Sequence, residues 1–265
     1  MTHAALTPPT ALRTIQAVAL GYLPRVFQAR GWVLAALPLA PVAAAIAVTL
    51  LVQAQGGRVS PAEGLKVFHE GLVKVLLPIL ALAAAPVGIR EDLEQRTLPL
   101  MLTRPAPVWA YPFAKGLLWF GWGALWLVVA SLGLFVLGAG WEAVGRGALA
   151  LVGVYWAELA FMTLLGLVFK RGTLWGALYI FLWDPLVRIL PGNFQRLTFL
   201  HYAESIAGSR TSEVGMRDLL AQTQLETPVW IAFGALLLFG LACWAACGWR
   251  LQTQPVGLAG KDAEG

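Results

Sequence analysis

The chain has 265 residues, of which 58% are hydrophobic and only 12% are charged, and its formal net charge is +5. Soluble proteins carry roughly 25% charged residues, so this chain has too few charges to cover a water-soluble fold of its size. A soluble enzyme, a disordered protein and a small disulfide-stabilised secreted domain are therefore excluded. The 19 Lys and Arg residues are scattered between apolar runs, which is typical of membrane anchors, so lipid is the expected environment and no nucleic-acid partner is expected.

The first predicted element is an amphipathic helix over residues 10–30. Its apolar positions fall on roughly one face at helical spacing: Leu12, Ile15, Val18, Tyr22 and Val26. Such a helix is expected to lie in the membrane interface. Pro24 predicts a break near its end.

Six stretches are long and apolar enough to span a membrane, which takes about 20 helical residues for a hydrocarbon core of about 30 Å. They cover residues about 32–53, 71–89, 113–138, 147–169, 173–190 and 228–249. Pro78 and Pro86 predict kinks in the second span. Thr227-Pro228 is typical of a helix start, with threonine as the cap. The predicted fold is therefore an all-α, polytopic membrane protein in which residues 1–265 form a single transmembrane domain.

The distribution of basic residues predicts the orientation of the chain. With the N-terminus inside, eleven of the 19 Lys and Arg residues fall on the inner side, in line with the positive-inside rule. Both termini are therefore expected in the cytoplasm. The first span starts too late and is too long for a cleaved signal peptide. Residues 191–227 then form an outer segment with one or two short helices, and residues 251–265 are expected to be a disordered tail.

Residues 90–104 follow the second span directly, and five charged residues fall within positions 90–96. Asp92 lies four residues before Arg96, which suits an ion pair along a helix. The leucines that follow offer an apolar surface. A short helix with a charged patch and an apolar patch, held at the membrane, suits docking to another protein, and an ordinary solvated connector fits the pattern equally well.

A resemblance to a known family is carried by Glu91-Asp92-Leu93-Glu94-Gln95-Arg96-Thr97-Leu98, by Leu102-Thr103-Arg104-Pro105 and by Lys115-Gly116. These residues resemble the stretch after the second span of type-2 ATP-binding-cassette exporter permeases, although Arg96 stands where that family usually has glycine. The resemblance implies that residues 90–104 form a cytoplasmic coupling helix, which sits in a cleft of an ATPase subunit. It assigns this contact to Arg90, Glu91, Asp92, Glu94, Arg96, Thr97, Leu98, Leu102 and Arg104.

The resemblance further implies a permease subunit in the cell membrane that pairs with a second copy or a related chain. ATP and magnesium would bind to the partner ATPase, because this chain has no phosphate-binding loop. Its only Gly-Lys pair, Gly260-Lys261, has Pro255 in place of the first glycine and Asp262 after it. The chain is therefore expected to be a non-catalytic transport subunit with no cofactor or metal of its own, and nothing in it selects a substrate.

Two carboxylates lie deep inside predicted spans, where charge is costly and often functional. Asp184, in the fifth span, lies four residues before Arg188, so an ion pair along the helix is the leading interpretation. Glu158, in the middle of the fourth span, has no obvious local partner. A place in the translocation path and a polar contact between helices are equally open for Glu158.

Two other activities compete with the permease interpretation. Glu91, Asp92 and Arg96 approximate the motif of glutamate-type intramembrane proteases, but that chemistry also needs histidines within the spans. The three histidines, His3, His69 and His201, all lie outside the predicted spans, so the protease is rejected. A secondary transporter or channel without an ATPase partner stays as the alternative, although such proteins usually carry intramembrane charges in both halves.

Overall fold

The computed structural model contains helices and no strands in the residues that it describes, which are 11–56, 71–94, 107–169, 171–183, 186–187, 193–208 and 227–253. The long helices are α1 (Ala11–Val26), α2 (Ala29–Ala54), α4 (Leu77–Glu94), α6 (Ala110–Leu132), α7 (Trp141–Val168) and α11 (Val229–Thr253). The shorter ones are η1 (Leu72–Leu76), η2 (Gly133–Phe135), α8 (Gly172–Leu178), η3 (Tyr179–Trp183), η4 (Asn193–Leu197) and α10 (Phe199–Ala207). The all-α prediction is confirmed.

Four helical stretches are long and apolar enough to cross a membrane: Ala29–Ala54, Ala110–Phe135, Trp141–Val168 and Val229–Thr253. They correspond to the first, third, fourth and sixth predicted spans, and they suit a multi-pass membrane protein. The second predicted span is divided between η1 and α4, and the fifth is helical from Gly172 to Trp183. Residues 184–185 and 188–190 of the fifth lie outside the described residues.

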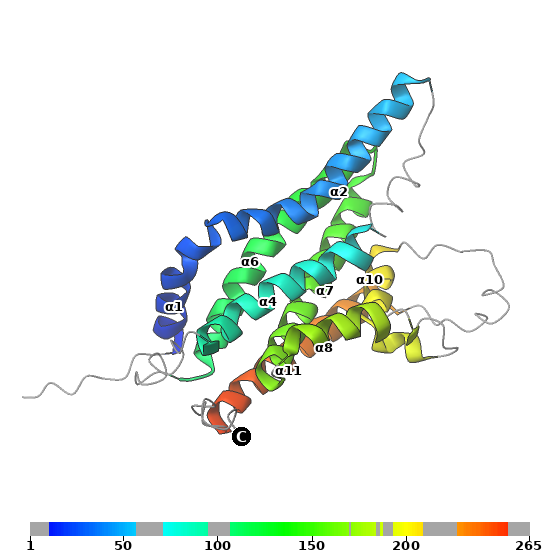
Figure 1. The fold of residues 1–265 in the computed structure, drawn as a ribbon. Helices are drawn as coiled ribbons and strands as arrows, with labels where there is room; N and C mark the ends of the chain where they lie inside the picture. The colour runs from blue at the N-terminus through cyan, green and yellow to red at the C-terminus, as the bar shows by residue number, and fades with distance from the viewer. Residues whose placement is uncertain are drawn as a thin grey trace, which may run out of the picture.

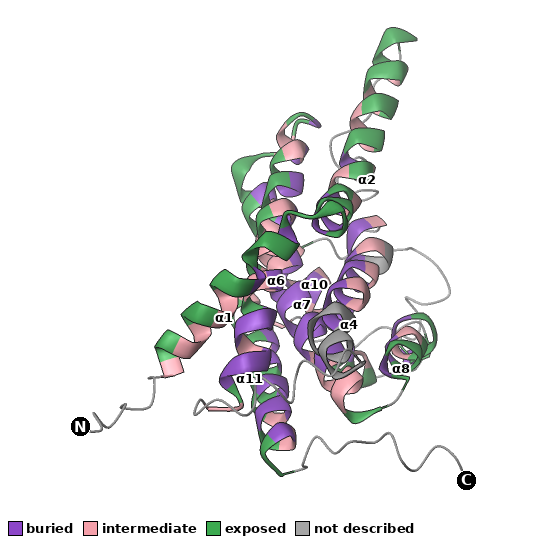
Figure 2. Ribbon diagram, turned by 60° about the vertical axis from the view of Figure 1, so that its left-hand side comes forward, coloured by how far each residue is buried: buried purple, intermediate pink, exposed green. Residues whose placement is uncertain are grey.

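Helix α7 is the centre of the bundle, with α4, α6, α10 and α11 packed around it (Figures 1 and 2). Small residues let these neighbours approach closely. They include Gly147, Ala150, Gly153, Ala157 and Ala160, all of them buried. At Gly153, for example, the Phe233 ring of α11 lies where a methyl group would be in tight contact, at 3.1 Å. The small residues of α7 therefore set the distances to the helices packed around it.

Helices α1 and α2 are separated by a break at residues 27–28, which starts three residues after Pro24, as the proline predicts. A Cβ atom at Gly31 would overlap the carbonyl group of Val26, so glycine is required at this elbow. Beyond Val42, by contrast, α2 is exposed or only half-buried and extends past the other helices (Figures 1 and 2).

The apolar face predicted for the first helix is used for packing within the protein. Tyr22 and Val26 are buried and Val18 packs beside Tyr22, so that α1 lies along α6 (Figure 1). Leu12, at the start of the predicted face, is exposed, and the large apolar residues Leu20 and Leu23, outside that face, are exposed as well. The C-terminal half of the predicted apolar face is therefore buried, as expected, and it packs against α6.

Both interrupted spans contain a π-helical turn just before a proline. Segment η1 ends at Leu76, two residues before Pro78, and η3 ends at Trp183, two residues before Pro185 in the sequence. Proline has no N–H group, and its ring crowds the carbonyl four residues earlier. A wider turn relieves that crowding, and in η1 the Leu77 N–H donates to the carbonyl of Leu72, five residues back. Pro86, by contrast, lies within α4 without interrupting the helix.

Two short helices occupy the predicted outer segment in its described part. Thr198 caps α10 by accepting a hydrogen bond from the His201 N–H, and Gly208 ends it with a φ of 68°. The start of α11 differs from the prediction: the helix begins at Val229, and the Thr227 hydroxyl is hydrogen-bonded to Nε2 of His201 at 3.1 Å. Thr227 thus ties α11 to α10, and the Pro228 carbonyl accepts the first helical bond, from Ala232.

Candidate functional site

The described part of the predicted coupling segment is the end of α4. Arg90, Glu91, Asp92 and Glu94 all belong to this helix, which continues five residues past the predicted end of the second span. Its earlier residues Leu77, Leu80, Ala81 and Ala84 are buried in the main core. Because one continuous helix holds both sets, a displacement of residues 90–94 would be carried into the core. The remaining assigned residues, Arg96, Thr97, Leu98, Leu102 and Arg104, lie outside the described residues.

Lys115 lies near the start of α6, beside α4, and is almost completely buried, with an exposed fraction of 2%. Its ammonium nitrogen is 4.0 Å from the ring centroid of Tyr22 in α1 and 5.7 Å from that of Tyr111 in α6. The hydroxyl groups of Tyr22 and Tyr111 are hydrogen-bonded at 2.8 Å, and the rings meet edge to face. We call Tyr22, Tyr111 and Lys115 the tyrosine–lysine cluster.

The tyrosine–lysine cluster sits where four helices end or begin. Leu251 of α11 completes its buried part, and Val108, Leu118 and Leu167 pack against it at the start of α6 and the end of α7. On the exposed side of the cluster, the guanidinium carbon of Arg25 lies 4.7 Å from the Tyr22 ring centroid. The Tyr22 ring therefore contacts two cations, one buried and one exposed.

Burying an ammonium group costs several kcal/mol of hydration free energy. A desolvated cation over an aromatic ring gains about 2 kcal/mol or more, so the two tyrosines offset part of that cost. A methionine of similar size would pack at this position with no such cost. The choice of lysine is therefore not explained by packing alone.

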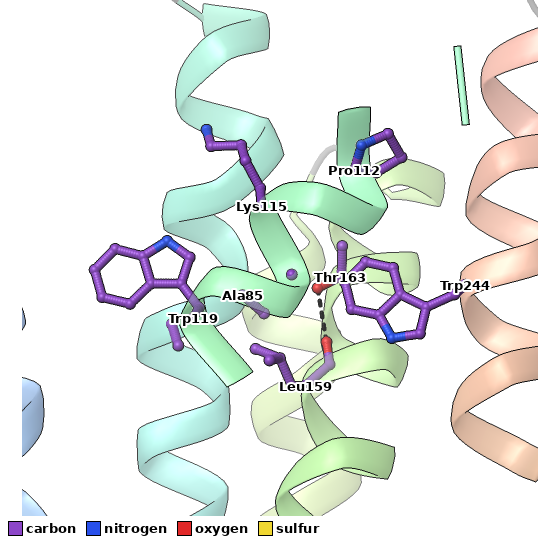
Figure 3. Close-up of a pocket in the computed structure, with 9 residues that line it drawn as sticks. Ala85, Pro112, Lys115, Trp119, Leu159, Thr163 and Trp244 are labelled. Atoms are coloured by element: carbon purple, nitrogen blue, oxygen red, sulfur yellow. Dashed lines mark hydrogen bonds between the residues drawn. The ribbon is translucent and has the colours of Figure 1, made fainter. Parts of the chain in front are cut away.

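A small cavity lies on the bundle side of Lys115, where α4, α6, α7 and α11 converge (Figure 3). Its volume is about 10 Å³, which is roughly the room needed by one water molecule. The lining residues are Ala84, Ala85, Pro112, Lys115, Gly116, Trp119, Leu159, Thr163 and Trp244. The Thr163 hydroxyl donates to the Leu159 carbonyl, and the buried Trp244 Nε1 has no hydrogen-bond partner among the described residues. A cavity of this size is not a substrate pocket.

Glu158, the proposed intramembrane candidate, is 4% exposed and lies in the most deeply buried part of α7. The residue is enclosed within one copy of the chain, among neighbours such as Tyr155, whose hydroxyl donates to the Trp119 carbonyl at 3.1 Å. This burial suits the polar-contact interpretation better than a position on an open path. The second candidate, Asp184, lies outside the described residues.

The tryptophans of the third predicted span serve packing. Trp122 contacts Phe27, Trp32 and Trp126 edge to face, and its Nε1 donates to the Gly31 carbonyl at 3.0 Å. This cluster fixes the elbow between α1 and α2 on α6, about two turns from Lys115. The third tryptophan, Trp119, is buried and lines the small cavity.

Sequence reasoning missed the role of Lys115 in the packing of α1. Lys115 falls inside the third predicted span, four residues after Tyr111, and the sequence offered it only as part of the Lys115-Gly116 resemblance and as a basic residue on the inner side. A lysine within an apolar run, one helical turn from a tyrosine, is a usable signal for a buried cation. The contribution of Tyr22 had no such signal, because it depends on how α1 folds back onto α6.

No protein-family model matches the chain, and neither a curated protein nor a solved structure matches it. The function is therefore inferred from the residues themselves and from the sequence resemblance.

Proposed function

We propose that the chain is the membrane-spanning permease subunit of an ATP-binding-cassette exporter. The observation that carries this proposal is the unbroken passage of α4 from the buried core into Arg90, Glu91, Asp92 and Glu94, where the family-like motif starts. A stiff helix of this kind can pass a push from a docked protein into the bundle. Residues 90–104 act as the coupling helix.

The proposed architecture has six spans with both termini in the cytoplasm. The second and fifth spans are the two with π-helical turns, and α1 lies on the inner side beside α6. Two copies of the chain, or this chain and a related one, pair in the cell membrane, and an ATPase subunit docks under each. ATP and magnesium bind to those ATPase subunits, while this chain performs no catalysis.

The test is purification followed by a transport assay. Gentle extraction of the tagged chain from its native membrane should recover an ATPase subunit in equal amount. Vesicles containing the complex should move a labelled substrate panel only when ATP and magnesium are on the ATPase side. Recovery without any ATPase, together with flux that ignores ATP, would exclude the exporter.

The alternative is a secondary transporter that needs no ATPase, and the buried carboxylate of Glu158 in α7 favours it. A proton or sodium gradient would then drive flux in vesicles containing the chain alone. Flux that follows the imposed gradient without ATP would select this second candidate.

A further inference from the structure

We propose that the tyrosine–lysine cluster is a latch that holds α1 on the start of α6, so that α1 moves together with α6. Lys115 is a positioning residue in this latch. Its buried ammonium group lies against the Tyr22 ring at 4.0 Å, and the two tyrosine hydroxyls join α1 to α6 through one hydrogen bond.

The latch matters for α1 because the helix is not continuous with α2 at its C-terminal end. Residues 27–28 interrupt the helical backbone between α1 and α2. The elbow cluster around Trp122 anchors one end of α1, through ring contacts with Phe27 and a hydrogen bond to Gly31. Tyr22 is the next buried aromatic anchor, and without it the earlier turns of α1 are attached to α6 only through half-buried side chains such as Val18.

The choice of residues favours a latch over ordinary packing. A cation against a ring is held by electrostatic attraction, and the attraction acts in many orientations of the flexible lysine stem. Such a contact can persist through small shifts of one helix against the other, whereas tightly fitted apolar side chains resist such shifts. Lys115 also lines the small cavity where α4, α6, α7 and α11 converge, so it lies between α1 and the rest of the bundle (Figure 3).

The transport consequence rests on the proposed function. Helix α4 ends at Glu94, inside the coupling segment 90–104, and α6 starts at Ala110, six residues after that segment. A push on that segment would tilt the start of α6, and the latch would carry α1 with it. The N-terminal helix would then be a moving part of the transport cycle.

The latch can be tested by measuring the distance between α1 and α6. Spin labels are placed on exposed positions, at Gln16→Cys and Leu125→Cys, in a chain with Cys243→Ala and Cys247→Ala. The distance distribution is recorded by pulsed electron resonance in lipid nanodiscs. Lys115→Met and Tyr22→Leu should each broaden the distribution at least twofold, while Lys115→Arg, which keeps the cation, should leave it narrow.

Arg25→Gln is the matched control, because it removes the exposed cation from the Tyr22 ring and leaves Lys115 in place. It should leave the distribution narrow. A distribution as narrow in Lys115→Met as in the unaltered chain would overturn the latch, and so would equal broadening by Lys115→Arg.

The transport arm uses the complex with its ATPase subunit in vesicles. Lys115→Met should lower the substrate moved per ATP hydrolysed severalfold, and Lys115→Arg should restore it. Broadened distances with unchanged transport per ATP would overturn the link between the latch and transport. Absence of any ATPase partner would refute the proposed function, while the distance measurement would still decide whether the latch exists.

Discussion

Glu158 and Lys115 are the charged side chains that the described part of the chain buries, and they differ in depth. Lys115 lies at the end of the bundle, against two aromatic rings, whereas Glu158 lies in the most deeply buried part of the central helix α7. Changing Glu158 therefore alters a polar group in the core without altering the surface of the protein.

We expect Glu158→Gln to change transport rate or substrate preference at unchanged protein level. Glutamine keeps the volume and the hydrogen-bonding capacity of the side chain and removes its ability to ionise. The measurement is vesicle flux normalised to the amount of purified protein. Glu142→Gln, at an exposed position at the start of α7, is the control. Flux equal to that of the unaltered chain would leave Glu158 with a purely structural role.

Gly116 illustrates how tightly the helices approach beside the cavity. A Cβ atom at Gly116 would overlap the buried ring of Trp244, whereas one at Gly121, also in α6, would meet open space. We expect Gly116→Ala to lower the melting temperature of the purified protein by several degrees, because overpacking costs about 1–3 kcal/mol. Gly121→Ala should leave the melting temperature unchanged or raise it, since alanine favours helix. Equal melting temperatures for the two variants would contradict the close contact.

Among the secondary-structure elements, the π-helical turns show which prolines distort the backbone. Pro78 and Pro86 both lie in the second predicted span, and only the first is preceded by a wide turn. The sequence predicted a kink at each proline and could not say which one would distort the backbone. That difference depends on the neighbours of each turn: η1 contacts α2 and α10 as well as α4.

We expect Pro78→Ala to slow hydrogen exchange of the amides in Leu72–Leu76 by about fivefold. Restoring the N–H group lets the turn close as an α-helix, and one additional hydrogen bond is worth about 1 kcal/mol. The measurement is exchange followed by mass spectrometry of the purified protein. Pro86→Ala, in an uninterrupted stretch, should leave the exchange of these amides unchanged. Unchanged exchange in Pro78→Ala would mean that the π-helical turn has another cause.

At the scale of the whole molecule, α4 connects the charged end of the second predicted span to the core. We expect Glu91→Lys combined with Glu94→Lys to uncouple ATP hydrolysis from transport, because reversed charges would repel the basic partners of a docked ATPase. Vesicle flux per ATP hydrolysed should fall at least tenfold while the melting temperature stays the same.

Glu142→Lys combined with Glu204→Lys is the control for that pair, because it makes the same change in net charge on α7 and α10, at the other end of α7 from its contact with the tyrosine–lysine cluster. Its transport per ATP should match that of the unaltered chain. Normal coupling in the Glu91 and Glu94 variant would remove residues 90–104 from the coupling role.

The sequence by itself predicted a membrane protein, and it determined the all-α class and the approximate positions of the long helices. These follow from the length of apolar runs, which is a local property, since each long helix satisfies its own backbone hydrogen bonds. The charged end of α4 was also visible in the sequence, although its continuity with the span was not.

Only the tertiary structure decided which face of α1 is buried, where Lys115 places its charge, and that Thr227 bonds His201 instead of capping α11. Each of these depends on a helix that lies far away in the chain: Tyr22 and Tyr111 are 89 positions apart, and His201 and Thr227 are 26 apart. A side chain that is both apolar and polar, such as lysine or tyrosine, can lie in lipid, in water or in a core. The opposing helix makes that choice, and local sequence does not specify which helix it is.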